Sequence, residues 1–347
     1  MSEYVVREIS PLDGCAMRQV CALLARTQLS LDAHLDLTVG LYDEEDTLLA
    51  TGSLFGATLR CLAVEPARQG EGLLNRVVAA LVERALARGV RQVFVYTKCE
   101  AVRALSALGF YEIERVPGRL AFMTNRPRAF AEYVDGLARD ASGEEASAIV
   151  MNANPFTLGH LRLLEHAAGE SRTVYCFVVS EDASLVPFQA RLALVKEGAA
   201  NLANVVVKPS GAYIISNATF PSYFLKDDEL VTRTHAQLDI RVFAHIARAL
   251  HIPRRFAGEE PFSGITRIYN EEMARLLPES GIQFIEIPRA QAGGVAISAS
   301  AVRRLLKEGP PEAIRPFVPD ATYRYFTSEA GRAAIERIRA AQRVEHD

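Results

Sequence analysis

The chain has 347 residues, more than one hydrophobic core usually serves, so we expect two domains. Hydrophobic residues make up 49% of it and charged residues 23%, which excludes a disordered chain and allows each domain its own core. Because 39 basic and 42 acidic residues are spread evenly, with a formal net charge of −3, we expect no binding to nucleic acid or to an anionic membrane surface.

The first part of the chain mixes short strands with helices. Apolar patterns predict strands at 4–9, 37–42, 48–55, 58–64, 92–97 and 110–115, and helices at 14–27, 73–88, 101–108 and 128–137. We therefore expect an α+β domain over residues 1–140. Small and acidic residues at 139–147 predict the linker to the next domain.

The second part, residues 145–347, has a different pattern. Apolar runs at 148–152, 174–180, 204–210, 254–260 and 283–289 are separated by helical patterns, which predicts βαβ units and a Rossmann-like parallel sheet. The chain as a whole is thus expected to be α/β. Ligands of such sheets gather at the carboxyl ends of the strands.

The stretch M-N-A-N-P-F-T-L-G-H, residues 151–160, lies where the first of these strands gives way to a helix. Pro155 ends strand pairing, and Gly159 lets the backbone come close to a bulky ligand where the helix begins. The helix start favours phosphate, to which His160 can donate a hydrogen bond, while Thr157 either caps the helix or contacts the phosphate. The alternative is a plain turn, with the threonine as N-cap and the histidine as an ordinary first-turn residue.

The stretch I-S-A-S-A-V-R, residues 297–303, also precedes a helix. Ser298 or Ser300 can hold terminal phosphates, and Arg303 faces the same place one turn later. A serine N-cap followed by a solvated arginine is the alternative. Between the two stretches a strand ends at Gly258, where adenine or ribose can rest on backbone, and Glu259 either contacts ribose or is solvated.

A third loop lies in the first domain, in L-A-V-E-P-A-R-Q-G-E-G-L-L at 62–74. A strand, a glycine-containing loop and an amphipathic helix follow one another there, which predicts a cradle of N–H groups for phosphates. Its candidate ligand-binding residues are Val64, Gln69, Gly70, Gly72 and Leu73.

This loop resembles the acyl-CoA-binding loop of GNAT acetyltransferases, whose pattern is [QR]-x-x-G-x-[GA]. Gln69 and Gly72 match the pattern, whereas Leu74 stands where glycine or alanine is expected. A-L-G-F-Y-E-I at 107–113 also resembles a GNAT segment. The resemblance implies a GNAT-like fold, and three uses of the domain stay open: binding a CoA-like group, transferring an acyl group or docking a partner.

N-P-F-T-L-G-H and I-S-A-S-A-V-R resemble the two signatures of the nucleotidyltransferase superfamily, in the same order. This resemblance implies an adenylating site without a metal-ligating residue. The catalytic residues it implies are His160, Thr157 and Arg303. The ATP-binding residues it implies are Asn154, Phe156, Gly159, Gly258, Glu259, Ser298 and Ser300. Arg191 falls where related enzymes carry an arginine near the start of a helix, and a structural ion pair is its alternative.

Over nearly its whole length the chain resembles the citrate lyase ligase family, in both motifs and in Y-I-I-S-N-A-T-F-P-S-Y-F-L-K at 213–226. The resemblance implies that ATP and Mg²⁺ activate acetate as acetyl-adenylate. The acetyl group then passes to the thiol of a dephospho-CoA-derived group on the acyl carrier subunit of citrate lyase. One rival is an adenylyltransferase that joins AMP to a phosphorylated cofactor precursor. Another is a non-catalytic sensor or docking role for the first domain.

Five scattered cysteines, mostly in apolar surroundings, are typical of reduced thiols in a cytoplasmic protein. The N-terminal stretch lacks a basic region followed by a long apolar run, and nowhere do about 18 apolar residues stand together. We therefore expect neither export nor membrane insertion.

Overall fold

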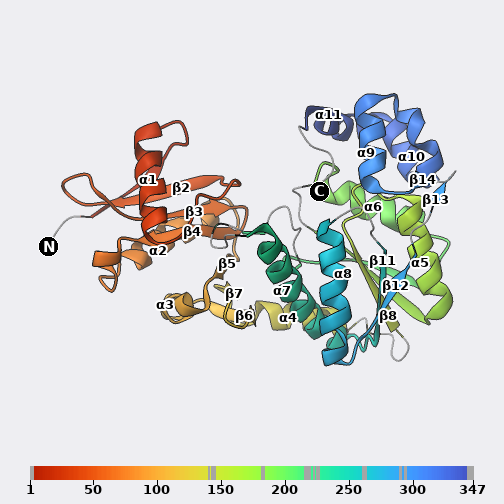
Figure 1. The fold of residues 1–347 in the computed structure, drawn as a ribbon, viewed down its shortest axis with the longest axis horizontal. Coiled ribbons are helices and arrows are strands. Elements are labelled where there is room, and N and C mark those ends of the chain that lie inside the picture. Colours follow the sequence, from red (N-terminus) through yellow and green to blue (C-terminus); the bar gives the residue numbers. More distant parts are fainter. Residues whose placement is uncertain are drawn as a thin grey trace. The chain divides into compact units, whose positions relative to one another are not determined.

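The computed structural model describes residues 4–139, 141, 146–180, 184–214, 220–221, 223, 227–259, 264–288, 291–292 and 295–341. The chain forms two compact units (Figure 1). The first is Met1–Phe130 with Pro221–Thr234, and the second is Ala131–Phe220 with His235–Asp347.

This division differs from the expected linker at 139–147. Helix α4 (Ala129–Ala138) lies mostly in the second unit, and a later segment, Pro221–Thr234, belongs to the first. Most of the expected linker, and residues 215–219, 222 and 224–226 of the phrase at 213–226, lie outside the described residues.

The first unit is built on a seven-stranded sheet in the order β1-β2-β3-β4-β5-β7-β6. Its strands are β1 (Val5–Ile9), β2 (Leu37–Tyr42), β3 (Leu48–Phe55), β4 (Thr58–Val64), β5 (Phe94–Thr97), β6 (Tyr111–Val116) and β7 (Leu120–Thr124). Its helices are α1 (Gly14–Arg26), α2 (Leu73–Ala87) and α3 (Val102–Ala107), with short 3₁₀ turns η1 (Pro66–Arg68) and η2 (Cys99–Ala101). The α+β expectation is confirmed, and β7 is a strand that the apolar pattern did not predict.

Helix α2 shows why this unit folds as it does. Its buried residues recur at helical spacing and so form one face, which packs on the sheet as part of the core cluster. The helix starts at Gly72 in the left-handed conformation, and Gly89, with φ of 83°, follows its last turn.

The pairing of β4 with β5 is short. These parallel strands pair at Thr58↔Phe94 and Leu59↔Val95, where their register ends. Cys61, two residues further along β4, has a φ of 51°, a conformation that a side-chain-bearing residue rarely adopts in a strand. The ladder therefore stops midway, and the rest of β4 separates from β5.

The second unit holds a five-stranded parallel sheet in the order β10-β9-β8-β11-β12. Its strands are β8 (Ala146–Met151), β9 (Thr173–Val178), β10 (Val205–Pro209), β11 (Arg254–Gly258) and β12 (Gln283–Ile287). Its helices are α5 (Leu158–Glu170), α6 (Phe188–Gly198), α7 (Asp228–Ala249), which begins in the first unit, and α8 (Gly264–Leu276), followed by η3 (Pro278–Ser280). The expected Rossmann-like parallel sheet is confirmed.

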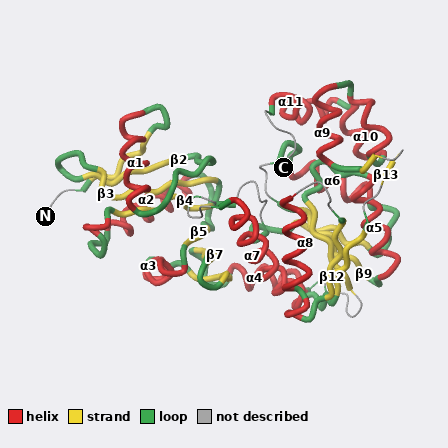
Figure 2. Tube along the Cα trace, in the orientation of Figure 1, coloured by secondary structure: helices red, strands yellow, loops and turns green. Residues whose placement is uncertain are grey.

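In this unit helices cover both faces of the sheet, with α5 on one side and α7 and α8 on the other (Figures 1 and 2). The small ribbon β13 (Gln291–Ala292) and β14 (Val295–Ala296) leads into a helical group at one end of the unit. This group consists of α9 (Ala299–Glu308), η4 (Pro311–Phe317), α10 (Asp320–Thr327), η5 (Glu329–Gly331) and α11 (Arg332–Ala340), and it has a small core of its own.

Candidate functional site

The order of the parallel strands determines where a ligand can bind. Strands β8 and β11 are neighbours, and the connections after them run in opposite directions, to β9 and to β12. This is the switch point of a doubly wound sheet, where ligands bind outside the carboxyl ends of the strands. The first motif follows β8, and Gly258 ends β11, so both predicted regions lie at this point.

Thr157 begins helix α5 as its N-cap. Its Oγ1 accepts a hydrogen bond from the His160 N–H at 3.4 Å, and its own N–H donates to Nδ1 of His160 at 3.1 Å. This reciprocal pattern is a capping box, with histidine in the place usually taken by glutamate or glutamine. Thr157 is buried, at 1% exposure. Of the two roles left open by the sequence, its hydroxyl therefore has that of the cap.

The capping box also defines the protonation of His160. Because Nδ1 accepts from the Thr157 N–H, the neutral ring carries its proton on Nε2. The ring also stacks on Phe156, with centroids 5.8 Å apart and planes at 15°. Phe156 is fully buried, so its side chain supports the imidazole instead of lying open to a ligand. The histidine thus presents an Nε2–H donor in a fixed orientation.

Helix α9 begins at the second motif with the same kind of cap. Ser298 is its N-cap and accepts from the Ala301 N–H at 3.0 Å, while its Oγ lies 3.1 Å from Oγ of Ser300. The serine cap considered in the sequence is therefore present. Contact of either hydroxyl with phosphate stays a prediction, and Ser300, in the first turn, is the better placed because it is not the cap.

The two motifs touch at Gly159. A Cβ added there would lie 3.3 Å from the carbonyl oxygen of Ile297, tighter than ordinary contact. The close approach at this glycine is therefore to the second motif, whereas the approach of a ligand expected from the sequence stays a prediction. Glycine at this position lets the starts of α5 and α9 come together.

Arg303 joins the motifs a second time. Its Nη1 donates to the carbonyl oxygen of Asn154, and both residues are 1% exposed. The alternative of a solvated arginine is therefore wrong. The side chain of Asn154, which precedes a cis bond to Pro155, accepts through Oδ1 from the Val186 N–H at 3.0 Å. Arg303 and Asn154 accordingly hold the loop after β8 in place.

Arg191 has a similar supporting role. It is fully buried, and its Nη1 donates to the carbonyl oxygens of Asn152 at 2.7 Å and of Val179 at 2.8 Å. Nη1 also bonds the side-chain oxygen of Asn152 at 2.8 Å. The guanidinium thereby ties the ends of β8 and β9 together. The sequence did not single out Asn152, although a polar residue directly after a buried strand was a usable signal.

At the end of β11, Gly258 and Glu259 are positioned through their backbone. The Gly258 carbonyl accepts from Nδ2 of Asn270 at 3.1 Å, and the Glu259 N–H donates to the Ile287 carbonyl at 2.8 Å. Glu259 is exposed, so its carboxylate can reach a ligand or stay in solvent. Asn270 was not predicted; an asparagine among the buried positions of α8 was its signal.

The loop of the first unit starts helix α2 as predicted. Gly70 and Gly72 have φ values of 87° and 77°, and added Cβ atoms would meet nothing within 4 Å. These glycines are therefore required by backbone conformation and not by a close contact inside the protein. Gln69 is exposed and Val64 half-buried, whereas Leu73 is buried in the core and offers only its backbone to a ligand.

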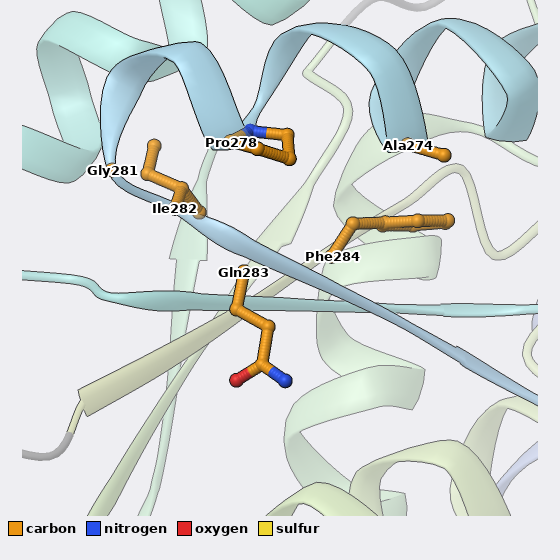
Figure 3. Close-up of a pocket in the computed structure, with 6 residues that line it drawn as sticks. All are labelled: Ala274, Pro278, Gly281, Ile282, Gln283 and Phe284. Carbon is orange, nitrogen blue, oxygen red and sulfur yellow. The ribbon is translucent and has the colours of Figure 1, made fainter.

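A depression elsewhere in the second unit does not coincide with these residues. It is lined by Ala274, Pro278 and residues 281–284 (Figure 3). Gln283 is the first residue of β12, so this depression lies at the amino end of the strand. The candidate site lies at the opposite, carboxyl end of the sheet.

Comparison with known proteins decides the family. Residues 146–326 match the model of the citrate lyase ligase C-terminal domain. The chain is 37% identical over 305 residues to citrate (pro-3S)-lyase ligase of Klebsiella pneumoniae, covering 86% of this chain and 89% of that protein. The protein of the same name from Escherichia coli K12 is 34% identical over 316 residues, with 89% and 90% covered. The chain belongs to the citrate lyase ligase family. The family resemblance seen in the motifs is thereby confirmed.

Solved acetyltransferase structures are similar to the N-terminal part of this citrate lyase ligase family member. An acyl-CoA N-acyltransferase from Klebsiella pneumoniae covers 35% of the chain at 17% identity with a TM-score of 0.30. An aminoglycoside 6′-N-acetyltransferase with coenzyme A covers 35% at 14% identity, also with a TM-score of 0.30. Within the described residues, no helix is long and apolar enough to cross a membrane.

Proposed function

We propose that this protein activates acetate with ATP and transfers the acetyl group to the thiol of a prosthetic group on the acyl carrier subunit of citrate lyase. An acetate oxygen attacks the α-phosphorus of ATP and pyrophosphate leaves. The thiolate then attacks the acetyl carbonyl, AMP leaves and the thiol proton goes to solvent. The observation that carries the proposal is the meeting of the two motifs at the strand switch point, in a chain whose family relatives are named citrate lyase ligases.

The arrangement suits the first step. In-line attack on phosphorus needs positioning and stabilisation of charge on the phosphoryl oxygens more than covalent help. The Nε2–H of His160 and the N–H groups at the start of α5 can donate to those oxygens. Ser300 at the start of α9 can donate to the terminal phosphates. In this scheme Thr157 and Arg303 are positioning residues, because their polar groups bond His160 and Asn154.

Mg²⁺ is proposed to arrive with the nucleotide as MgATP. Mg²⁺ keeps several waters and is commonly held by substrate phosphates with few protein ligands. The described residues hold no group of three or more His, Cys, Asp or Glu side chains that could bind a metal by themselves.

For the second step, we propose that the helix start at Gly70 and Gly72 binds the pyrophosphate of the prosthetic arm. Both glycines have left-handed backbone conformations directly before helix α2, and turns of this kind can offer backbone N–H groups to a phosphate. A Gly72→Asp variant places a carboxylate there and strains the backbone. Normal acetyl-adenylate formation with slowed carrier acylation is the expected result, and unchanged acylation would exclude the loop as the docking place.

Two of the protein's own thiols are poor nucleophiles for the acetyl group. All five cysteines are free, and burial raises the pKa of Cys61 and of Cys176 to about 12, so both stay protonated at neutral pH. We propose that the protein works in the cytoplasm, where free thiols persist. The nucleophile proposed for the second step is the carrier's thiol.

The proposal is tested by ATP–pyrophosphate exchange with MgATP and with acetate, citrate or longer acids added singly. Exchange that depends on acetate is expected. A second assay follows transfer of labelled acetate to thiol-form citrate lyase. Absence of exchange with every acid, with and without the thiol-form lyase, would overturn the proposal, and AMP transfer to a phosphorylated cofactor precursor would establish the rival.

A further inference from the structure

Two helices of the second unit bring a tyrosine and a histidine together. Helices α7 and α8 lie side by side on one face of the parallel sheet (Figure 1). Tyr269 of α8 places its hydroxyl oxygen 2.6 Å from Nδ1 of His235 of α7. This is the distance of a good hydrogen bond, and a proton can pass along such a bond.

The histidine of this pair is fixed, whereas the tyrosine is within reach of a ligand. His235 is 1% exposed, and its ring stacks on Phe220 with centroids 4.3 Å apart and planes at 20°. The ring of Tyr269 meets it edge-on, at 5.5 Å and 80°. Tyr269 itself is half-buried. The tyrosine is thus the member of the pair that a ligand can contact, and the histidine stands behind it.

The pair lies beside the carboxyl end of the sheet. Asn270, the residue after Tyr269, donates from Nδ2 to the carbonyl of Gly258, the last residue of β11, at 3.1 Å. Helix α7 ends at Ala249, just before β11 starts, so it runs antiparallel to that strand. His235 lies about 21 Å before the end of α7, whereas β11 is only about 13 Å long. The pair is therefore at the same edge of the sheet as the candidate site.

The second step of the proposed reaction needs a base. A thiol attacks as its thiolate, and with an ordinary pKa of about 8.5 most of it is protonated at neutral pH. His160 does not suit this task, because its Nδ1 accepts from the Thr157 N–H and its Nε2 already carries the ring proton. Imidazole is the usual proton acceptor of enzymes near neutral pH, and His235 is a second imidazole at this edge of the sheet.

We propose that Tyr269 and His235 form a proton relay for the thiol step. Tyr269 is the catalytic residue, because its hydroxyl contacts the incoming thiol, and His235 acts through it. The relay uses the imidazole tautomer in which Nδ1 accepts from the Tyr269 hydroxyl. The assignment rests on the proposed function for the identity of the thiol and of the acetyl-adenylate.

The relay moves one proton along two bonds. The thiol proton passes to the oxygen of Tyr269 while the phenolic proton passes to Nδ1 of His235. The sulfur forms a bond to the acetyl carbon, the bond between that carbon and the phosphate oxygen breaks, and AMP leaves with the bonding electrons. His235 then returns its proton through Tyr269 to solvent, which restores the pair.

Charged side chains surround the pair. Asp239 lies one turn after His235 on α7, and Arg255 of β11 interacts electrostatically with both Asp239 and Tyr269. A guanidinium favours negative charge on the tyrosine oxygen during the transfer, and an ionised carboxylate favours an imidazolium. Glu272, three residues after Tyr269 on α8, is already paired with a cation. The surroundings can therefore stabilise the charges that the relay creates.

The test supplies acetyl-adenylate directly, so that it does not depend on adenylation. Acetyl-adenylate with a labelled acetyl group and thiol-form citrate lyase are mixed with the full chain, and acetyl transfer is followed from pH 6 to pH 9. The variants are Tyr269→Phe and His235→Gln, whose amide can accept a hydrogen bond but not a proton. Tyr323→Phe is the matched control, because Tyr323 is a half-buried tyrosine on α10 of the same unit.

Both variants of the pair should slow transfer at pH 7 by about 10²-fold, a usual contribution of general base catalysis, and Tyr323→Phe should leave it unchanged. Their transfer rate should then rise by about tenfold per pH unit, because it follows the thiolate fraction, and approach that of the unmodified protein near pH 9. A variant that merely distorts the site would lose the same factor at every pH.

Normal transfer by Tyr269→Phe at pH 7 would overturn the assignment, and so would a loss that is the same at every pH. Acetate-dependent ATP–pyrophosphate exchange is measured beside it and should be unchanged in both variants, which also shows that they are folded. If His235→Gln is unstable, Tyr269→Phe decides alone. Absence of exchange from every protein, the unmodified chain included, counts against the proposed function, whereas a pH-dependent loss with supplied acetyl-adenylate still supports the relay.

Discussion

The guanidinium of Arg303 donates a hydrogen bond to the backbone carbonyl of Asn154, across 149 residues of sequence. The contact fastens the start of helix α9 to the loop that follows β8. Because both groups are buried, losing the donor leaves a carbonyl oxygen without this partner away from water.

Arg303→Met is therefore expected to lower the free energy of unfolding by about 1–3 kcal/mol, the cost of an unsatisfied buried group. Arg304→Met is the matched control, since Arg304 is the next residue on α9 and is exposed. Urea denaturation of the two variants measures the difference. Equal midpoints would contradict a role for Arg303 in holding the loop.

His160→Ala should reduce the rate of acetate-dependent ATP–pyrophosphate exchange by a factor of about 10²–10³. This is the usual effect of removing one hydrogen-bond donor that stabilises charge in a transition state. His160→Asn should be equally slow but more stable, because its amide oxygen can still accept from the Thr157 N–H. His166→Ala is the control: His166 lies on the same helix and pairs with Glu170 at 3.0 Å. A well-folded His160→Ala with normal exchange would remove His160 from the mechanism.

Thr157→Ala removes the cap of α5 and the hydroxyl beside His160. We expect a loss of about 0.5–2 kcal/mol in unfolding free energy, together with slower exchange because the imidazole loses its orientation. Thr157→Ser keeps the oxygen and should recover most of both. Recovery of stability without recovery of exchange would mean that the threonine methyl group, and not the cap, is needed for activity.

Two glycines of α5 offer a paired test. Gly169→Ala should raise the free energy of unfolding by about 0.5–1 kcal/mol, because alanine favours helix and the added Cβ meets open space. Gly159→Ala should give no such gain and should slow exchange, since its Cβ would press on the Ile297 carbonyl at 3.3 Å. Melting curves and exchange rates of the two variants, measured side by side, check the expectation. Equal gains in the free energy of unfolding would show that the Ile297 carbonyl leaves room for a side chain at position 159.

The buried carboxyl group of Asp239 should make the stability of the protein depend on pH. Burial raises the pKa of this carboxyl from 3.8 to about 7, although the nearby Arg255 lowers it. Between these values the folded protein binds a proton that the unfolded chain has released, so stability should fall as pH rises from about 4 to about 7. Asp239→Asn should flatten this slope and be relatively more stable at pH 8. Urea titrations of the unmodified protein and of Asp239→Asn at pH 5 and pH 8 measure both stabilities. If the change in stability between the two pH values is the same in both proteins, Asp239 does not cause the pH dependence.

Local sequence patterns predicted most elements because their cause is local. The apolar runs of the parallel strands and the buried face of α2 can be read from residue spacing. Strand β7 was not predicted, although Leu120–Thr124 is a short apolar run that is buried throughout, as is the predicted strand β2. The assignment of Pro221–Thr234 to the first unit was also missed, because it depends on contacts between distant parts of the chain.

The site shows the same limit. Residue types and order were enough to predict a strand-end site with His160 at a helix start. The use of each polar group was not predictable. The cap made by the Thr157 hydroxyl is local, but the sequence left it beside phosphate contact as an alternative. The burial of Arg303 depends on its contact with Asn154, 149 residues away. Partners such as Asn152 and Asn270 stand outside any motif and are identified by their contacts alone.

The link between Asn154 and Arg303 also has a consequence for biosynthesis. The ribosome adds Asn154 long before Arg303, so the nascent chain carries its first motif for 149 residues without this partner. Early domains fold while later residues are still being made. A polypeptide that ends before Ala299 lacks the start of helix α9, one of the two helix starts at the site. We therefore expect such a polypeptide not to react with ATP. The topology therefore requires translation to pass helix α9 before the two motifs can meet.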